Sequence, residues 1–358
     1  MWAMIVKEFR QLRRDRRTLA MMVFLPILLL VVFGYAASFD VESISVRVVG
    51  PAADRLAGAL PAPFEVEDVD PLADRSDAVV SLRDGEVPVA LVTSPTGVTI
   101  LLDGSELFIA NAVKASFASF RPNLPEGLTA NVEVLFNEDL ETSAIMVPGL
   151  AAMILLFVGT VITSLGVVRE RQAGTLEQLA VMPLRPTDVF LGKIAPYFVV
   201  AAIDLAVVVV AGIWLFDVPF RGSVLVLALG ALLFLFVTLG IGVLISSVSE
   251  NQGQAIQLAL MTLLPQVMLS GLIFPLSSMA AGVRWIGYGL PLTYFIQISR
   301  GVMLRGASIA ALWTPFLYLA IIGAVVFGLA TLRFRRSLAP ARAGRRQEAE
   351  LVLEGASS

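Results

Sequence analysis

The sequence predicts a polytopic α-helical membrane protein, and its composition and hydropathy pattern are the evidence. Hydrophobic residues make up 57% and charged residues 15% of the 358 residues. The mean hydropathy is +0.83, and soluble globular chains rarely reach such values. Six apolar stretches are long enough to cross a hydrocarbon core of roughly 30 Å as helices of about 20 residues. We therefore expect six transmembrane helices, near residues 18–38, 144–168, 189–216, 223–248, 255–275 and 311–333.

The N-terminal segment, residues 1–17, carries a basic amphipathic pattern. Apolar residues recur at helical spacing opposite Lys and Arg, which predicts an interfacial helix on the cytoplasmic leaflet; a frayed basic terminus is the alternative. The next stretch, 18–38, is too long for a removable signal peptide and lacks a small-residue cleavage site. Six basic residues against two acidic ones precede this stretch, which places the N-terminus in the cytoplasm. Six spans return the tail, 334–358, to the same side.

Residues 39–143 are the one long polar region, and this topology places them outside. The region holds six basic and eighteen acidic residues. The carboxylates are scattered rather than spaced as in a calcium loop, so a solvated acidic surface is favoured over metal binding. Alternating strand-like and helical patterns predict a small extracytoplasmic α/β domain. The strand-like runs are 44–49, 64–69, 87–93 and 98–102, and the helical patterns are 54–60, 73–83 and 106–119.

The chain contains no Cys and no His. This excludes Cys/His zinc sites, Cys–His and Ser–His–Asp nucleophilic catalysis, haem ligation through His, and disulfides. The G-x-x-x-x-G-K-[ST] motif is also missing, so nothing in the sequence holds ATP phosphates by the P-loop mechanism. We therefore expect no catalytic residues and no metal. The net charge of −3 is nearly neutral, which argues against a nucleic-acid partner.

A charged segment between the second and third spans is the strongest local signal. Thr175 to Gln178 fits a capping box, Leu176 and Leu179 lie on one apolar stripe, and Pro183 ends the helix within about two turns. An amphipathic helix at the membrane face is suited to docking with a partner protein that transmits movement to the spans. An ordinary cytoplasmic loop is the alternative.

Asp204 is the ionisable residue that stands out within the spans, near the middle of the third. A carboxylate there is costly, so it should face protein or water. With Gln257 and Gln266 on the fifth span it forms a candidate intramembrane polar site. A hydrogen-bonded structural Asp is favoured over a cation or proton site.

Several motifs carry a resemblance to a known family over essentially the whole chain. They are Leu82–Ala90, Asp103–Ser105, Met146–Gly149, Arg169–Leu179, Pro183–Pro186, Gly192–Tyr197, Ser270–Pro275, Pro291–Phe295, Arg300–Gly301 and Arg305–Gly306. The chain resembles the permease subunits of type-two ABC exporters, in the drug-export-like branch with a large extracytoplasmic insert between the first two spans.

The resemblance implies an arrangement of parts and partners. Residues 1–17 would be the elbow helix, 170–182 a coupling helix, and 275–306 re-entrant outer-leaflet helices within a transmembrane domain over 144–333. The partners would be the lipid bilayer, a second permease copy (a homodimer or a pair with a similar permease) and an ABC ATPase subunit that carries ATP and Mg, leaving no cofactor in this chain. The residues matching the coupling helix are Glu170, Gly174, Thr175, Leu176, Glu177, Gln178 and Leu179.

The implied function is export of a drug-like, lipid or other hydrophobic substrate across the cytoplasmic membrane of a prokaryote. Asp204 departs from the family pattern, so no family role carries over to it. A non-transporting membrane transmitter, whose outer domain senses an envelope component, is the alternative function. Such transmitters generally have four spans and a larger outer domain, so the six predicted spans favour transport.

Overall fold

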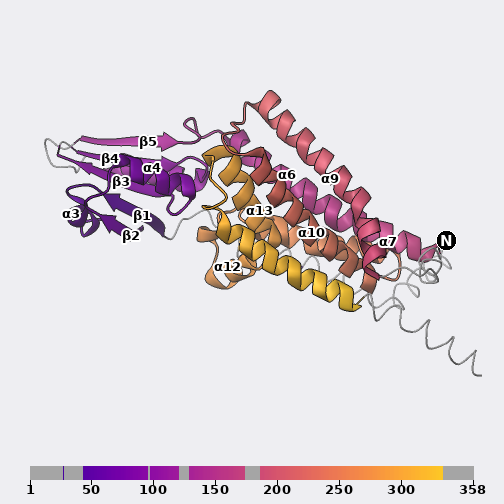
Figure 1. Cartoon of the computed structure of the whole chain (residues 1–358). Helices are drawn as coiled ribbons and strands as arrows, with labels where there is room; N and C mark the ends of the chain where they lie inside the picture. Colours follow the sequence, from indigo (N-terminus) through magenta and orange to yellow (C-terminus); the bar gives the residue numbers. More distant parts are fainter. Residues whose placement is uncertain (1–26, 28–42, 96, 121–128, 174–185, 334–358) are drawn as a thin grey trace, which may run out of the picture.

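The computed structural model describes residues 27, 43–95, 97–120, 129–173 and 186–333. These residues form an α/β domain at one end and a helical bundle that extends away from it (Figure 1). The interfacial helix, most of the first span and the tail expected from the sequence lie outside the described residues.

The α/β domain is built on a five-stranded sheet with the order β2-β1-β3-β4-β5. Strand β1 pairs in parallel with β2 and β3, β4 pairs in parallel with β5, and β3 and β4 are antiparallel. The strands are β1 (Ile44–Val49), β2 (Phe64–Asp70), β3 (Val89–Ser94), β4 (Gly97–Asp103) and β5 (Thr129–Leu135). The first four lie where the sequence predicts them, whereas β5 was not predicted.

Helices cover both faces of this sheet because successive strand residues point to opposite sides. In β4, Ile100 and Leu102 enter the apolar cluster under α3 (Ala53–Ala57) and α5 (Leu107–Phe120), while Leu101 enters the cluster under α4 (Arg75–Asp84). Asp74 begins α4 with a capping box. The result is a three-layer domain in which the parallel strands β4 and β5 run towards the bundle, and β5 is followed by α6 (Thr142–Phe157).

The bundle contains four described helices that are long and apolar enough to cross a membrane: Thr142–Gln172, Phe198–Phe216, Val224–Val248 and Trp313–Arg333. The first comprises α6 (Thr142–Phe157), the π-helical η2 (Val158–Ile162) and α7 (Thr163–Gln172). The second is the apolar part of α9 (Pro186–Phe216), and the third is α10 (Val224–Val248). Four predicted spans therefore correspond to observed helices.

The predicted fifth span, 255–275, differs from the observed α11 (Gln252–Leu269). The helix stops six residues earlier because Gly271 adopts φ +85°, which turns the chain before Pro275. Four glutamines lower the hydropathy of α11, and it is not among the four candidate spans of the described residues. A broken series follows it: η3 (Leu276–Ser278), α12 (Ala281–Tyr288), α13 (Pro291–Arg300) and the π-helical η4 (Gly301–Arg305).

The outward faces of the long helices are apolar. On α9, Val199, Ile203, Val207 and Val210 are all about half exposed, and the helix Trp313–Arg333 exposes a similar aliphatic stripe. Large exposed apolar surfaces on several neighbouring helices indicate a lipid environment.

Candidate functional site

A cavity of about 760 Å³ lies where the α/β domain meets the broken helices. The turn between α4 and β3 and the start of α5 line it on one side. The end of α11, α13, η4 and the beginning of the last helix line the other side. It carries charged side chains from both parts of the molecule, among them Glu86, Glu106, Arg300 and Arg305.

A buried ion pair joins the two parts beside this cavity. Arg305 Nη1 of η4 lies 3.1 Å from Asp103 Oδ2 of β4, and the two side chains are 11% and 1% exposed. The other carboxylate oxygen, Asp103 Oδ1, accepts a hydrogen bond from the Ser105 amide at 2.8 Å. The carboxylate is thus held from both sides, as a buried charge requires.

Gly85 makes room for the Arg305 side chain. It ends α4 with φ +77°, and a Cβ at this position would lie 2.9 Å from Arg305 Nη2. Glycine therefore serves two purposes here, the left-handed helix cap and the close approach of the guanidinium to the backbone.

Glu106 is a second carboxyl at this junction. Burial raises its pKa above the ordinary value, and the positive charge of Arg300 opposes that shift. The native state consequently holds the Glu106 proton more tightly than the unfolded chain does. Its stabilising contribution is present below the ordinary carboxyl pKa and is lost as the pH rises through the native value.

This direction gives a testable pH dependence. Glu106→Gln removes the cost of a buried carboxylate, so we expect it to raise the midpoint of thermal unfolding at pH 8 and to do so less at pH 5. Circular dichroism of the purified protein in detergent measures the difference. Glu65→Gln, at an exposed site of β2, is the matched control and should change neither midpoint. An equal gain at both pH values would contradict the assignment.

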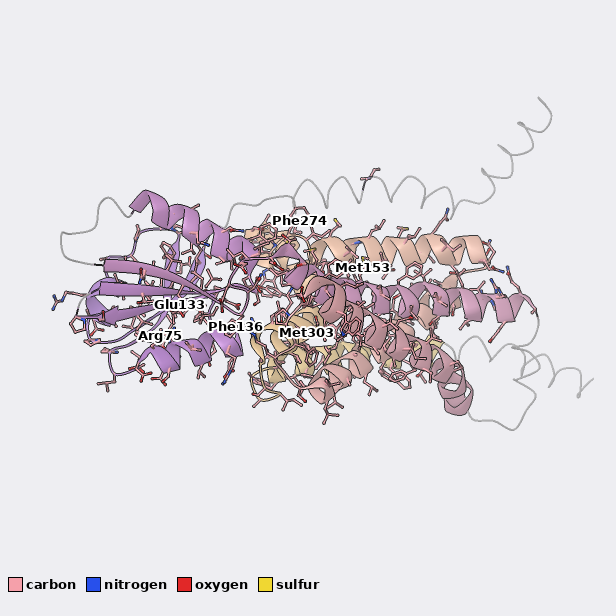
Figure 2. The ribbon with its side chains drawn as sticks, turned by 90° about the horizontal axis from the view of Figure 1, so that it is seen from above. Arg75, Glu133, Phe136, Met153, Phe274 and Met303 are labelled. Carbon is pink, nitrogen blue, oxygen red and sulfur yellow. The ribbon has the colours of Figure 1, made fainter. Side chains whose placement is uncertain are left out.

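The link from β5 to α6 is tightly held. Phe136 has φ +71°, a strained conformation for an aromatic residue, and the buried Asn137 side chain clamps the link. Its Nδ2 donates to the Gly104 and Glu141 carbonyls at 3.2 and 3.1 Å. Arg221, from the α9–α10 connection, lies 5.9 Å from the centre of the Phe136 ring. Figure 2 shows Phe136 where the α/β domain meets the bundle.

At the opposite end of the bundle, α7 is tied to the connection between α10 and α11. The Arg171 guanidinium donates to the Ser249 carbonyl, and Gln252 Nε2 donates to Gln172 Oε1 at 3.0 Å. Glu170 lies on this last turn of α7. The other predicted coupling residues, Gly174, Thr175, Leu176, Glu177, Gln178 and Leu179, lie outside the described residues.

The predicted intramembrane polar residues do not form one hydrogen-bonded site. Asp204 is half buried on α9, which packs chiefly on α6. Gln257 and Gln266 are on α11, whose main neighbour is α7. Both glutamine Oε1 atoms are buried without a hydrogen-bond partner in the described part of the chain. A polar role for these three residues stays a prediction.

The sequence interpretation missed Asp103, Glu106 and Arg305 as members of one site. Asp103 and Arg305 were recognised only within family motifs, and they are 202 residues apart. The available signal was chemical, because arginines within an apolar, Gly- and Pro-interrupted stretch require buried partners.

The long apolar helices and their exposed aliphatic faces define a multi-pass membrane protein with a folded α/β domain. Residues 16–332 match the family described as "ABC-2 family transporter protein". The chain therefore belongs to this family, and it is a type-two ABC permease rather than an enzyme.

Several curated proteins are similar along most of their length. The probable multidrug ABC transporter permeases YbhS and YbhR of Escherichia coli (strain K12) are 29% and 28% identical over 368 and 366 residues. Each alignment covers 94% of this chain, and 97% and 99% of the two relatives. The inner membrane transport permease YhhJ of the same organism is 32% identical over 239 residues, 64% of this chain and 62% of that protein. Membership implies an ABC ATPase partner and a membrane setting.

Proposed function

We propose that this permease exports a drug-like, lipid or other hydrophobic substrate across the cytoplasmic membrane, driven by a separate ABC ATPase. The ATPase carries ATP and Mg, and two permease copies form the transport unit. Six spans cross the bilayer, the α/β domain lies outside, and residues 275–306 re-enter the outer leaflet. The similarity to YbhS and YbhR, which are probable multidrug ABC transporter permeases, supports a multidrug substrate class.

The continuous helix from Thr142 to Gln172 carries the mechanical part of this proposal. One end of the helix adjoins the clamped link to the α/β domain, and the other leads directly into the expected coupling segment, 170–182. At that end, the contacts of Arg171 and Gln172 fasten α7 to the α10–α11 connection. A displacement of the coupling segment by the ATPase would thus move α7, α10 and α11 together.

The coupling segment gives the direct test. Glu177→Arg, Leu176→Ala and Leu179→Ala alter its charge and its apolar stripe, and the loss of a buried interface anchor weakens association by about tenfold or more. We expect transport to be abolished and less ATPase to co-purify, while the permease still inserts into the membrane.

Glu350→Arg in the C-terminal tail is the control for the charge reversal and should leave both measurements unchanged. If transport and co-purification both survive the coupling-segment substitutions, the segment is a simple connector and the proposed mechanism is wrong.

A further inference from the structure

Arg300 is a buried guanidinium with Glu106 and Asp103 as its carboxylate neighbours, but neither lies close enough to form an ion pair with it. Arg300 is 8% exposed. Its Nη1 donates to the Gly271 carbonyl at 3.4 Å and its Nη2 to the Leu272 carbonyl at 3.3 Å, and both distances are near the outer limit for hydrogen bonds. Its Nε has no hydrogen-bond partner among the described residues. Among those same residues, no carboxylate forms an ion pair with it. A buried charge left in this state is costly unless something in the cavity pairs with it.

Two other residues that line the cavity, Arg305 and Ser270, have buried donor atoms without partners in the described part of the chain. Arg305 uses Nη1 for its ion pair with Asp103, and its Nε has no partner in the described part of the chain. The Ser270 hydroxyl, 2% exposed, is likewise without a partner there. Two guanidiniums and a hydroxyl around one space form a donor set suited to an anion with several oxygens, since guanidinium binds phosphate through paired hydrogen bonds.

The carboxylates of the cavity do not remove this preference. Glu86 Oε2 lies 3.4 Å from Arg47 Nη1, and Asp84 Oδ1 lies 3.1 Å from Arg83 Nε. Each of these two carboxylates is therefore paired with an arginine of the α/β domain. Glu106 remains, and it is one carboxyl beside the two guanidiniums of Arg300 and Arg305.

The cavity is also larger than an inorganic anion needs. Its volume of about 760 Å³ falls in the range of sites for small organic molecules. Apolar side chains complete the lining, including Leu276, Ile296, Leu312 and Trp313. A ligand with a phosphate group and a short organic body fits both the donor set and this wall.

We infer that this cavity binds an organic phosphate, with Arg300 as the principal contact and Arg305 and Ser270 as additional donors. The phosphate group comes either from a lipid headgroup or from a soluble phosphate ester. The inference concerns equilibrium binding, so it is independent of the proposed transport mechanism and of the ATPase.

Trp313 provides the measurement, because it lines the cavity and is 61% exposed. The full chain, with Trp2, Trp214 and Trp285 replaced by Phe, is purified in phosphate-free detergent and titrated with two probes. Dioctanoyl phosphatidylglycerol represents the lipid headgroup, and glycerol 3-phosphate represents the soluble ester, with glycerol as the uncharged control. We expect saturable fluorescence changes with at least one phosphate probe and none with glycerol.

Arg300→Gln should weaken that binding by about tenfold or more, because a charged hydrogen-bonding partner is lost. Arg300→Lys keeps the charge without the planar fork and should give an intermediate affinity. Arg75→Gln makes the same charge change on the α/β domain, where Arg75 pairs with Glu133 (Figure 2); neither residue lines the cavity. This control should bind as tightly as the parent.

The outcomes separate the sources. A response to the phosphatidylglycerol alone assigns the site to a lipid headgroup, and a response to glycerol 3-phosphate assigns it to soluble phosphate esters. The inference is overturned if neither probe saturates, or if folded Arg300→Gln binds as the parent does. Should Arg300→Gln fail to fold, unchanged affinity in Arg300→Lys overturns it equally.

Discussion

Arg305→Ala is expected to lower the free energy of unfolding by about 3–5 kcal/mol, the usual cost of removing one partner from a buried ion pair. The Asp103 carboxylate, 1% exposed, would keep its bond from the Ser105 amide but lose the charge that lies 3.1 Å from its other oxygen. The α/β domain and η4 would also lose the ion pair that joins them. Chemical denaturation followed by circular dichroism in detergent measures the change.

A double-mutant cycle separates the ion pair from the loss of the arginine stem. Asp103→Asn keeps an oxygen for the Ser105 amide while removing the charge, and Arg305→Met keeps an apolar stem, so the double variant should be more stable than Arg305→Met alone. Independent, additive effects of the two substitutions would show that the pair contributes no coupling. Arg75→Ala breaks a half-exposed pair with Glu133 and should cost less than about 1 kcal/mol.

Hydropathy predicted the long helices well because each carries its own signal. The expected span 223–248 and the observed Val224–Val248 differ by one residue at the start. The third helix begins at Pro186, earlier than expected, because a proline at the first helical position is favourable while its polar neighbours carry no apolar signal. Strands with strong apolar runs were predicted equally well.

Features that depend on neighbours were not predicted. The seven-residue strand β5 was missed although Asn131 and Glu133 alternate with Val132 and Val134, a pattern like that of β2; its pairing with β4 is the part that depends on a neighbour. The pair of Asp103 with Arg305 likewise requires the fold to bring two distant segments together.

The choice of Asp204 as the leading polar residue shows the same limit. An acidic residue within an apolar stretch stands out in the sequence. In the fold, however, α9 packs mainly on a single helix and leaves Asp204 half buried. Arg300 sits in a less regular segment, but there the structure concentrates buried charge. Burial depends on how the helices pack. The sequence could therefore indicate that burying each charge costs free energy, but not which charges lie close together in the fold.

Gly242→Ala is expected to disrupt the contact between α10 and the first described span. A Cβ at residue 242 would lie 2.6 Å from the Gly159 carbonyl oxygen and 3.0 Å from that of Thr160. Both atoms belong to the backbone of the π-helical η2, which cannot yield as a flexible side chain would. Glycine here lets two helices approach closely, as small residues do in membrane bundles. Overpacking of this kind costs about 1–3 kcal/mol, occasionally more.

Gly328→Ala is the matched control, because a Cβ there would meet no atom within 4 Å among the described residues. This substitution lies in a helix and should raise stability by about 0.5–1 kcal/mol through lower backbone entropy in the unfolded chain. Opposite signs for the same chemical change, measured by denaturation in one detergent, would locate the cost in the contact between α10 and η2. If Gly242→Ala is also stabilising, the helices separate without penalty and η2 owes its π-helical turn to something other than this close packing.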